Sequence, residues 1–329
     1  MSRLSTESYL VFGGSGFVGC AIVKALLARG ETCVSVFDLV PKTFEGKVRV
    51  YTGDITDEEA VSTAIIESAA TCIFHTVSPI HGLPPPIYTK VNIDGTRTLL
   101  SCAITHKIPK FVYTSTTGVV WTGQSLNGVD EKSASVVKKG WDAYHDTKAK
   151  AETMVLAANS REEDGLKTVS IRPCALFGPD DKQLMHHASR TLKSKQTHIQ
   201  IGPNTAVMDF GYVDNIADAH LLAADKLPSR DDFSRIIWRE IGDVTPPSNV
   251  RIIPKGVAIV LAWILAIYGM VMGTKPMMDM YNVVWVTITQ VYKIDKAREV
   301  LGYEPRVGLE EGIKEMVKDG GYKNYQDEP

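Results

Sequence analysis

Two residues with complementary proton chemistry stand four positions apart, at Tyr144 and Lys148. In a helix this spacing puts the phenol and the ammonium on one face. A tyrosine with its ordinary pKa near about 10 is a poor base at neutral pH, but a neighbouring positive charge favours the phenolate. The phenolate can remove the proton of an alcohol while hydride leaves for a nicotinamide cofactor. The pair predicts a hydride-transfer site, although this four-residue spacing is common by itself.

Hydroxyl side chains supply the expected partner of this pair. They stand at 114–117, where a predicted strand ends. A hydroxyl there can donate a hydrogen bond to the substrate oxygen and stabilise charge that develops on it. Thr116 is the first choice for this catalytic role and Ser115 the second. The alternative is that these hydroxyls only cap the end of the strand.

A glycine-rich turn follows the first apolar run, with glycines at 13, 16 and 19 before a helix-length stretch. This is the spacing of a dinucleotide-binding turn. The first glycine bends the chain, the second lets backbone N–H groups reach a pyrophosphate, and the third allows close packing of helix on strand. The turn residues expected to bind the cofactor are Gly13, Gly14, Ser15, Gly16, Phe17 and Val18.

Acidic residues follow the next two strands. Asp38 closes the second strand, where a carboxylate accepts hydrogen bonds from the ribose hydroxyls and repels a 2′-phosphate. NAD is therefore expected rather than NADP, and a simple loop cap is the alternative. Asp54 and Ile55 follow the strand at 48–51 and are placed to bracket the adenine, although Gly-Asp is also ordinary turn chemistry.

These residues need a sheet to position them, and the first half of the chain predicts one. Apolar strand-length runs at 9–12, 33–37, 71–77, 110–116 and 168–172 alternate with helix-length stretches at 17–29, 58–68, 88–106 and 143–159. This alternation is typical of an α/β fold with a doubly wound parallel sheet of Rossmann type. Such a sheet binds ligands at the carboxyl ends of its strands.

The alternation loosens after about residue 179, which predicts a smaller, mainly helical C-terminal region. We expect residues 1–178 to form the NAD-binding domain with the tyrosine and lysine. Residues 179–329 are expected to bind the substrate, with part of 205–226 returning to the Rossmann core. A short polar bridge spans residues 227–233.

The composition of the chain bears on its binding partners and on its cellular compartment. A formal net charge of -2 argues against a nucleic-acid partner. The five cysteines are scattered without a C-x-x-C pair, which indicates reduced thiols and no metal site. The first apolar run is too short for a signal peptide. The catalytic part is therefore expected in the cytoplasm.

Residues 256–274 carry no formal charge and reach the length of a membrane span. Three placements are open: a span, a helix lying in one leaflet's interface, or a buried helix of the substrate pocket. The interfacial helix is favoured, because aromatic residues stand inside the run and prolines at its edges, namely Trp263, Tyr268, Pro254 and Pro276.

Together these motifs resemble an extended short-chain dehydrogenase/reductase. Within that group the chain is similar to the 3β-hydroxysteroid dehydrogenase/isomerase family, and there to fungal members acting on sterol 4α-carboxylates. The resemblance covers about 8–226 and 233–318. It rests on the turn, the Tyr/Lys pair and the segments at 75–79, 91–96, 113–121, 172–181, 213–220 and 301–305.

The resemblance implies roles for particular residues. Thr116, Tyr144 and Lys148 would form the catalytic set, and Lys148 would also bind the nicotinamide ribose. Pro173 would line the nicotinamide, and Thr76 would contact the cofactor. Thr117-Gly118 departs from the family's pattern, in which a second hydroxyl residue is followed by Ala-Gly; this alters the shape that faces the substrate.

The resemblance also implies an activity: NAD-dependent oxidation of a 3β-hydroxyl on an apolar sterol, triterpenoid or meroterpenoid-like substrate. Loss of a C4 carboxylate is a further expectation, with three candidate cations for that carboxylate at His186, His187 and Arg190. We expect the protein at the cytoplasmic face of the endoplasmic reticulum or in the cytoplasm. We also expect a homodimer that forms through 88–106 and 143–159.

Two alternative functions are open for the chain. One is a nucleotide-sugar epimerase or dehydratase of the same fold, and the other is a non-catalytic dinucleotide sensor.

Overall fold

The computed structural model describes most of the chain, and the sheet and its flanking helices lie within the described part. The described residues are 7–131, 133–160, 165–194, 199–201, 205–227, 251–253, 255–272, 290–308, 311–312 and 315.

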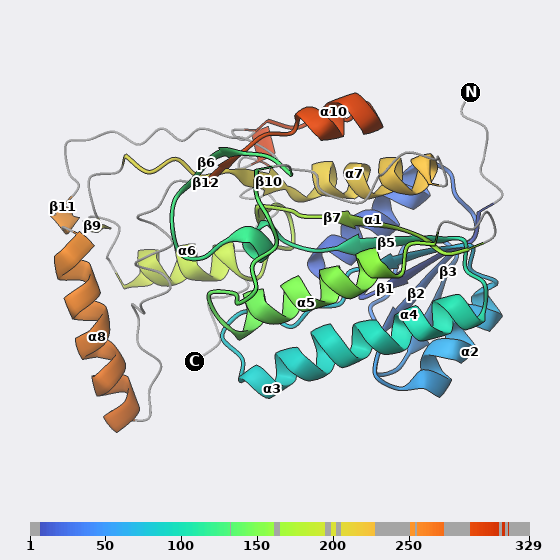
Figure 1. The fold of residues 1–329 in the computed structure, drawn as a ribbon, viewed down its shortest axis with the longest axis horizontal. Coiled ribbons are helices and arrows are strands. Elements are labelled where there is room, and N and C mark those ends of the chain that lie inside the picture. The colour runs from blue at the N-terminus through green and yellow to red at the C-terminus, as the bar shows by residue number, and fades with distance from the viewer. Residues whose placement is uncertain are drawn as a thin grey trace.

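A six-stranded parallel sheet forms the centre of the molecule (Figure 1), in the order β3-β2-β1-β4-β5-β7. The strands are β1 (Tyr9–Phe12), β2 (Val34–Asp38), β3 (Val48–Thr52), β4 (Cys72–His75), β5 (Lys110–Thr114) and β7 (Lys167–Ile171). The strand order reverses between β1 and β4, and in doubly wound sheets this switch point opens the ligand crevice at the carboxyl ends of the strands. The predicted Rossmann sheet is confirmed.

Helices cover both faces of the sheet (Figure 1). Side chains that alternate along β1 explain this: Tyr9 and Val11 join one buried cluster, whereas Leu10 and Phe12 join another. Fully burying each such side chain contributes about 1.5–3 kcal/mol. The helices on one face are α1 (Phe17–Ala28) and α7 (Val213–Lys226), and those on the other are α2 (Glu58–Ser68), α4 (Thr96–Thr105) and α5 (Ala143–Ala157).

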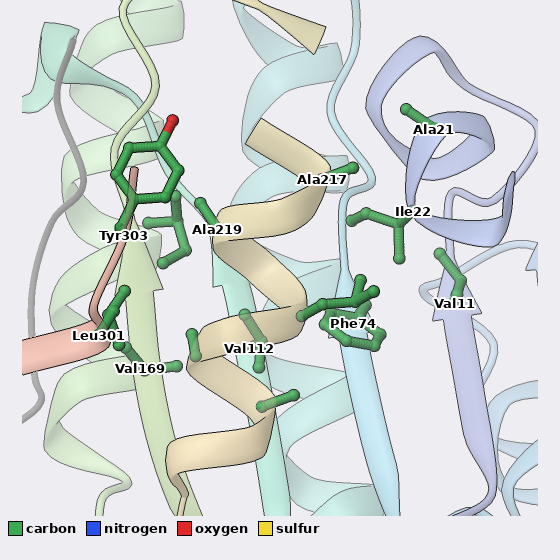
Figure 2. Packing of buried hydrophobic residues seen from close by; sticks show 14 of the residues in the cluster. Val11, Ala21, Ile22, Phe74, Val112, Val169, Ala217, Ala219, Leu301 and Tyr303 are labelled. Carbon is green, nitrogen blue, oxygen red and sulfur yellow. The ribbon is translucent and has the colours of Figure 1, made fainter. Parts of the chain in front are cut away.

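Helix α7 comes from the second half of the chain and packs on the sheet beside α1. Figure 2 shows Ala217 and Ala219 of α7 over Phe74 and Val112 of the strands. Arg29, just after α1, forms an ion pair with Asp225 of α7 at 2.8 Å. These contacts attach the returning segment to the cofactor half of the molecule.

Apart from the 18-residue helix α8, the remaining elements are short, and they lie mostly beyond the carboxyl edge of the sheet. Three parallel strand pairs form there: β8 (Ala175–Phe177) with β10 (Phe210–Tyr212), β9 (Ile199–Ile201) with β11 (Arg251–Ile253), and β6 (Leu126–Val129) with β12 (Gln290–Tyr292). The other elements are α3 (Pro85–Tyr88), η1 (Thr89–Gly95), η2 (Thr117–Val120), α6 (Leu184–Lys193), α8 (Lys255–Met272) and α10 (Asp295–Leu301).

The structure differs from the predicted elements in three places. The expected helix at 88–106 is interrupted by the π-helical turn η1, where Gly95 packs so closely on Ile55 that a Cβ would lie 2.5 Å from it. The strands expected to reach 77 and 116 end at His75 and Thr114, because the residues that follow turn away into the site. The polar bridge at 227–233 lies outside the described residues apart from Leu227.

Helix α8 accounts for most of the uncharged segment 256–274. Among the described residues, no helix combines the length and apolarity needed to cross a membrane. Even so, α8 exposes large apolar side chains at helical spacing, namely Val257, Val260, Leu261, Trp263, Ile264, Ile267 and Met270. We call this set the α8 apolar face.

Candidate active site

The glycine turn between β1 and α1 has no room for a Cβ at Gly13, Gly14 or Gly19. Gly13 has φ +79°, and a Cβ there would lie 2.7 Å from the Thr76 hydroxyl oxygen. A Cβ on Gly19 would lie 2.2 Å from the Gly13 carbonyl oxygen. The Thr76 hydroxyl donates hydrogen bonds to the Phe12 and Gly13 carbonyls at 2.8 and 3.1 Å. Thr76 thus lies at the turn and ties β4 to it.

The start of α1 fits a dinucleotide pyrophosphate. The first turn of a helix leaves backbone N–H groups without intrahelical partners, and these favour an anion. The N-cap of α1 is the exposed Gly16, which has no side chain to cap those groups, and no acidic residue stands in the first turn. Phe17 and Val18 open the helix and are half-buried. The N–H groups of this turn are therefore the ones that would bind the pyrophosphate.

Asp38 lies across the turn from Ser15. The Ser15 N–H donates to one carboxylate oxygen at 2.9 Å, and the Val40 N–H donates to the other at 3.1 Å. These bonds fix the half-buried carboxylate at the end of β2. This is the position from which it would accept hydrogen bonds from the adenosine ribose.

Asp38→Asn is expected to lower kcat/KM with NAD by about tenfold or more, because hydrogen bonds to a charged group contribute roughly 1.5–3 kcal/mol. The NADP-to-NAD ratio should rise, since repulsion of the 2′-phosphate disappears. Steady-state kinetics with both cofactors measure this. Glu45→Gln, on the exposed loop after β2, is the matched control. An unchanged cofactor ratio in Asp38→Asn would refute the assignment.

Asp54 and Ile55 face the π-helical turn rather than the glycine turn. Asp54 accepts a hydrogen bond from the Lys90 ammonium at 2.7 Å, and its pKa is lowered by this bond and by the Thr56 N–H. Ile55 is buried against Gly95. Their contact with the adenine stays a prediction.

The Tyr144 phenol lies at the carboxyl end of β5, beside the hydroxyl side chains of Thr116 and Ser78. Burial raises the pKa of Tyr144 to about 12, against the lowering effect of these two neighbouring hydroxyls. The expectation that Lys148 lowers this pKa is not met, because Lys148 is not among the groups that shift it. A phenol in this state is a proton donor, and it needs additional positive charge nearby to act as a base.

Lys148 lies one helical turn beyond Tyr144 and is fully buried. Its ammonium donates to the Thr114 carbonyl at 2.7 Å and lies 4.3 Å from the centre of the Tyr113 ring. Burial lowers the pKa of Lys148 to about 7, and the charge of Glu152 opposes this fall. Near neutral pH the amine can therefore take up or release a proton, which suits a residue that exchanges protons with the site.

The structure separates the two candidate hydroxyls at the end of β5. The Thr116 hydroxyl lies beside that of Tyr144 and accepts from the Gly118 N–H at 3.1 Å. The Ser115 hydroxyl is buried and has no hydrogen-bond partner among the described residues. Its backbone N–H bonds to Ile171, and the Thr117 N–H bonds to the Pro173 carbonyl at 2.9 Å. Pro173 is thereby positioned beside the hydroxyls.

Comparisons with known proteins show which family the chain belongs to. The model of the 3-beta hydroxysteroid dehydrogenase/isomerase family matches residues 10–241. The chain belongs to this family. The predicted resemblance is confirmed, and with it the class of oxidoreductase.

Relatives within the family are similar over nearly the whole chain. The decarboxylating sterol-4-alpha-carboxylate 3-dehydrogenase of Candida albicans is 35% identical over 94% of this chain and 96% of its own. The enzyme of the same name from Saccharomyces cerevisiae is 33% identical over 96% of this chain and 98% of its own. The mouse protein of that name is 28% identical over 94% and 89%.

Solved structures with this fold include UDP-glucose 4-epimerases. The enzyme of Thermus thermophilus, in complex with NAD, has a TM-score of 0.64 at 23% identity and covers 96% of this chain and 99% of its own. That of Thermotoga maritima, with UDP-glucose, has a TM-score of 0.68 at 23% identity, covering 96% and 99%. At this identity the likeness shows the fold alone.

The sequence did not predict that Ser78 and His81 lie beside Tyr144. Ser78 was expected only as part of a family motif, and His81 was not expected at the site. The ring of His81 lies 4.0 Å from the ring of Tyr144, measured between their centres. The available signal was the position of Ser78 directly beyond β4, at the same sheet edge as Thr116.

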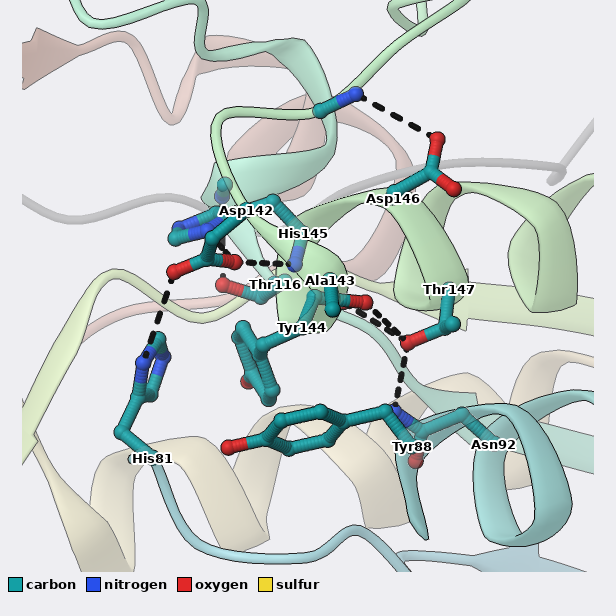
Figure 3. A network of polar contacts seen from close by, with 12 residues as sticks. His81, Tyr88, Asn92, Thr116, Asp142, Ala143, Tyr144, His145, Asp146 and Thr147 are labelled. Atoms are coloured by element: carbon teal, nitrogen blue, oxygen red, sulfur yellow. Dashed lines mark hydrogen bonds and ion pairs between the residues drawn. The ribbon is translucent and has the colours of Figure 1, made fainter. Parts of the chain in front are cut away.

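The cations predicted for a substrate carboxylate are on α6. Arg190 is exposed there, whereas the side chains of His186 and His187 lie outside the described residues. Asn92 is buried and donates to the Thr147 hydroxyl at 3.0 Å. It fastens the π-helical turn η1 to α5 behind Tyr144 (Figure 3).

Proposed function

We propose that the protein is an NAD-dependent dehydrogenase that oxidises the 3β-hydroxyl of a sterol or related terpenoid bearing a C4 carboxylate, with loss of that carboxylate as CO₂. The observation that carries this proposal is the Tyr144 phenol beside the Thr116 hydroxyl at the carboxyl end of β5, one turn from Lys148. It stands in a chain that is 33% and 35% identical to decarboxylating sterol-4-alpha-carboxylate 3-dehydrogenases over nearly its whole length.

The reaction needs one proton acceptor and one hydride acceptor. Tyr144 takes the proton of the alcohol, while Thr116 donates a hydrogen bond to the same oxygen. NAD, when bound, supplies the hydride acceptor and the positive charge that favours the Tyr144 phenolate. The residues that would bind it are the N–H groups at the start of α1, the carboxylate of Asp38, and Lys148 at the nicotinamide ribose.

Decarboxylation follows from the chemistry of the product. Oxidation at C3 gives a ketone beside the C4 carboxylate. The bond from C4 to the carboxyl carbon then breaks, CO₂ leaves, and its electron pair passes to the ketone as an enolate, which takes a proton at C4. The proton released in the oxidation balances the one consumed here. The protein has only to bind the carboxylate and to carry out the oxidation.

The nucleotide-sugar alternative shares the fold and the Tyr/Lys pair. It needs polar and cationic groups for a diphosphate in the C-terminal region, whereas α8 presents an apolar face there. The epimerase structures are also less similar in sequence, at 23% identity against 33% and 35%. The intact Tyr144, Thr116 and Lys148 set argues against a non-catalytic sensor.

A comparison of two sterols tests the proposal. Purified protein and NAD are given a 3β-hydroxysterol with a 4α-carboxylate, or the same sterol with a 4α-methyl group. We expect NADH formation with the first at a kcat/KM at least about tenfold higher, because a charge-assisted contact to the carboxylate is worth roughly 1.5–3 kcal/mol. Equal rates, or conversion of UDP-glucose to its C4 epimer instead, would contradict it.

We also propose that the α8 apolar face lies in a membrane interface, where an apolar substrate can enter without crossing water. Its exposed side chains recur with the spacing of one broad helix face, and Trp263 among them is a residue favoured at interfaces. A location at the cytoplasmic face of the endoplasmic reticulum, the division of the chain near residue 178, and a homodimer through 88–106 and 143–159 stay predictions.

Flotation with phosphatidylcholine vesicles measures this association. The double variant Val260→Glu/Ile264→Glu should reduce the vesicle-bound fraction at least about tenfold. It replaces with charges two apolar side chains that are exposed in the protein and that the proposal places in the membrane interface. The matched control is Ile66→Glu/Ile104→Glu, which charges exposed apolar positions on α2 and α4. Equal loss in both variants would assign the binding to general surface hydrophobicity and refute a role of α8.

A further inference from the structure

The loop between β4 and α3 is fixed around His81 by a buried tyrosine. The Tyr88 hydroxyl donates to the Ile80 carbonyl at 2.7 Å and accepts from the Leu83 N–H at 3.0 Å. These two bonds hold the backbone on both sides of His81. The same loop begins with Ser78, whose hydroxyl lies beside that of Tyr144 and lowers its pKa. The position of His81 is therefore set by the residues that also contact the catalytic phenol.

His81 lies against the catalytic tyrosine and faces an acidic residue (Figure 3). Its ring centre is 4.0 Å from that of Tyr144, and its Nδ1 is 3.9 Å from a carboxylate oxygen of Asp142. A third of the His81 side chain is exposed to solvent. The imidazole thus combines a fixed position beside the phenol with access for a ligand.

The contacts of Asp142 favour its ionised form beside the His81 imidazole. It caps α5 by accepting from the His145 N–H at 2.9 Å, and the same oxygen lies 2.7 Å from His145 Nδ1. Burial opposes ionisation of Asp142, but the contacts with His145 and the charge of His81 outweigh it, so the pKa lies below its ordinary value. A carboxylate at this place stabilises the imidazolium form of His81.

We infer that His81 binds the carboxylate on the carbon next to the reacting alcohol, an inference that rests on the proposed function. An alcohol oxygen bonded to Tyr144 places its neighbouring ring carbon beside the phenol, where the His81 ring lies. An imidazolium there can form a charge-assisted hydrogen bond with the substrate carboxylate.

Two other basic side chains near the phenol are buried. Lys148, one turn beyond Tyr144, donates to the Thr114 carbonyl. His145 lies 5.3 Å from Tyr144 between ring centres, but its side chain is only 5% exposed. His81, by contrast, contacts the Tyr144 ring and has a third of its side chain exposed.

Binding of two sterols to the protein saturated with NADH tests the inference. The ligands are a 3β-hydroxysterol 4α-carboxylate and its 4α-methyl analogue, titrated by NADH fluorescence. His81→Gln is expected to weaken the carboxylate at least about tenfold and to leave the methyl analogue unchanged. His81→Arg should retain the preference for the carboxylate. His106→Gln is the matched control and should behave as the unmodified protein, while Arg190→Gln tests the competing candidate on α6.

Equal weakening of both sterols in His81→Gln would show a structural role and overturn the inference, as would no weakening at all. Loss of the preference in Arg190→Gln would transfer the role to α6 and overturn it too. Far-ultraviolet circular dichroism confirms that each variant is folded. The proposed function fails separately: if NAD is not reduced but His81→Gln still abolishes the binding preference, the carboxylate site stands and the dehydrogenase activity does not.

Discussion

Tyr144→Phe is expected to lower turnover of the sterol carboxylate at least about 100-fold, because positioned acid–base groups contribute roughly 10²–10⁴-fold. The substitution removes the hydroxyl that lies beside those of Thr116 and Ser78 and keeps the ring that packs on His81. Cofactor binding should be unchanged, since this hydroxyl is assigned to the alcohol. Steady-state rates and NADH titration measure the two effects.

The pH profile sharpens this prediction. The pKa of Tyr144 is raised to about 12, so the fraction of phenolate grows as pH rises through the range of the assay. We expect kcat/KM for oxidation to rise from pH 6 to pH 9 in the unmodified protein and this rise to vanish in Tyr144→Phe. Tyr51→Phe, on the edge strand β3, is the matched control. Full turnover in Tyr144→Phe would remove the proposed mechanism.

Gly19→Ala is expected to weaken NADH binding by about 10- to 100-fold. A Cβ at this position would lie 2.2 Å from the Gly13 carbonyl oxygen, so α1 must move away from the turn. Overpacking of this kind costs about 1–3 kcal/mol, and every 1.4 kcal/mol is about tenfold in affinity. Fluorescence titration with NADH measures the change.

A glycine in open surroundings provides the control for this experiment. A Cβ on Gly256 meets nothing within 4 Å, so Gly256→Ala should bind NADH as the unmodified protein does. Thermal unfolding separates a local effect from a global one, since a local distortion weakens binding more than it lowers the melting temperature. Unaltered NADH affinity in Gly19→Ala would mean that the start of α1 does not bind the pyrophosphate.

The elements that carry the cofactor were predictable because local patterns determine them. The glycine spacing, the apolar β1 and the position of Asp38 each depend on neighbouring residues in the chain. Helix α2 was predicted to the residue, since Asp57 caps it and the apolar spacing continues to its end. The one-face placement of Tyr144 and Lys148 follows from helix periodicity alone.

The electrostatic state of the site was not predictable in the same way. A local argument makes Lys148 the partner that lowers the pKa of Tyr144. In the structure the ammonium turns to the Thr114 carbonyl, and burial dominates both pKa values. Likewise, the approach of His81 to Tyr144 depends on the bonds from Tyr88, which only the folded chain brings together. Contacts of this kind arise from tertiary packing, so the spacing of residues along the sequence does not predict them.

The central claim is that oxidation at C3 releases the C4 carboxylate of a sterol. The most direct measurement is the simultaneous yield of NADH and labelled CO₂ from a 3β-hydroxysterol carrying ¹³C in its 4α-carboxylate. We predict equal molar amounts of the two products, and neither product from Tyr144→Phe above about one hundredth of the normal rate. NADH without CO₂ from a stable 3-keto-4-carboxylate, or CO₂ without NADH, would contradict this account.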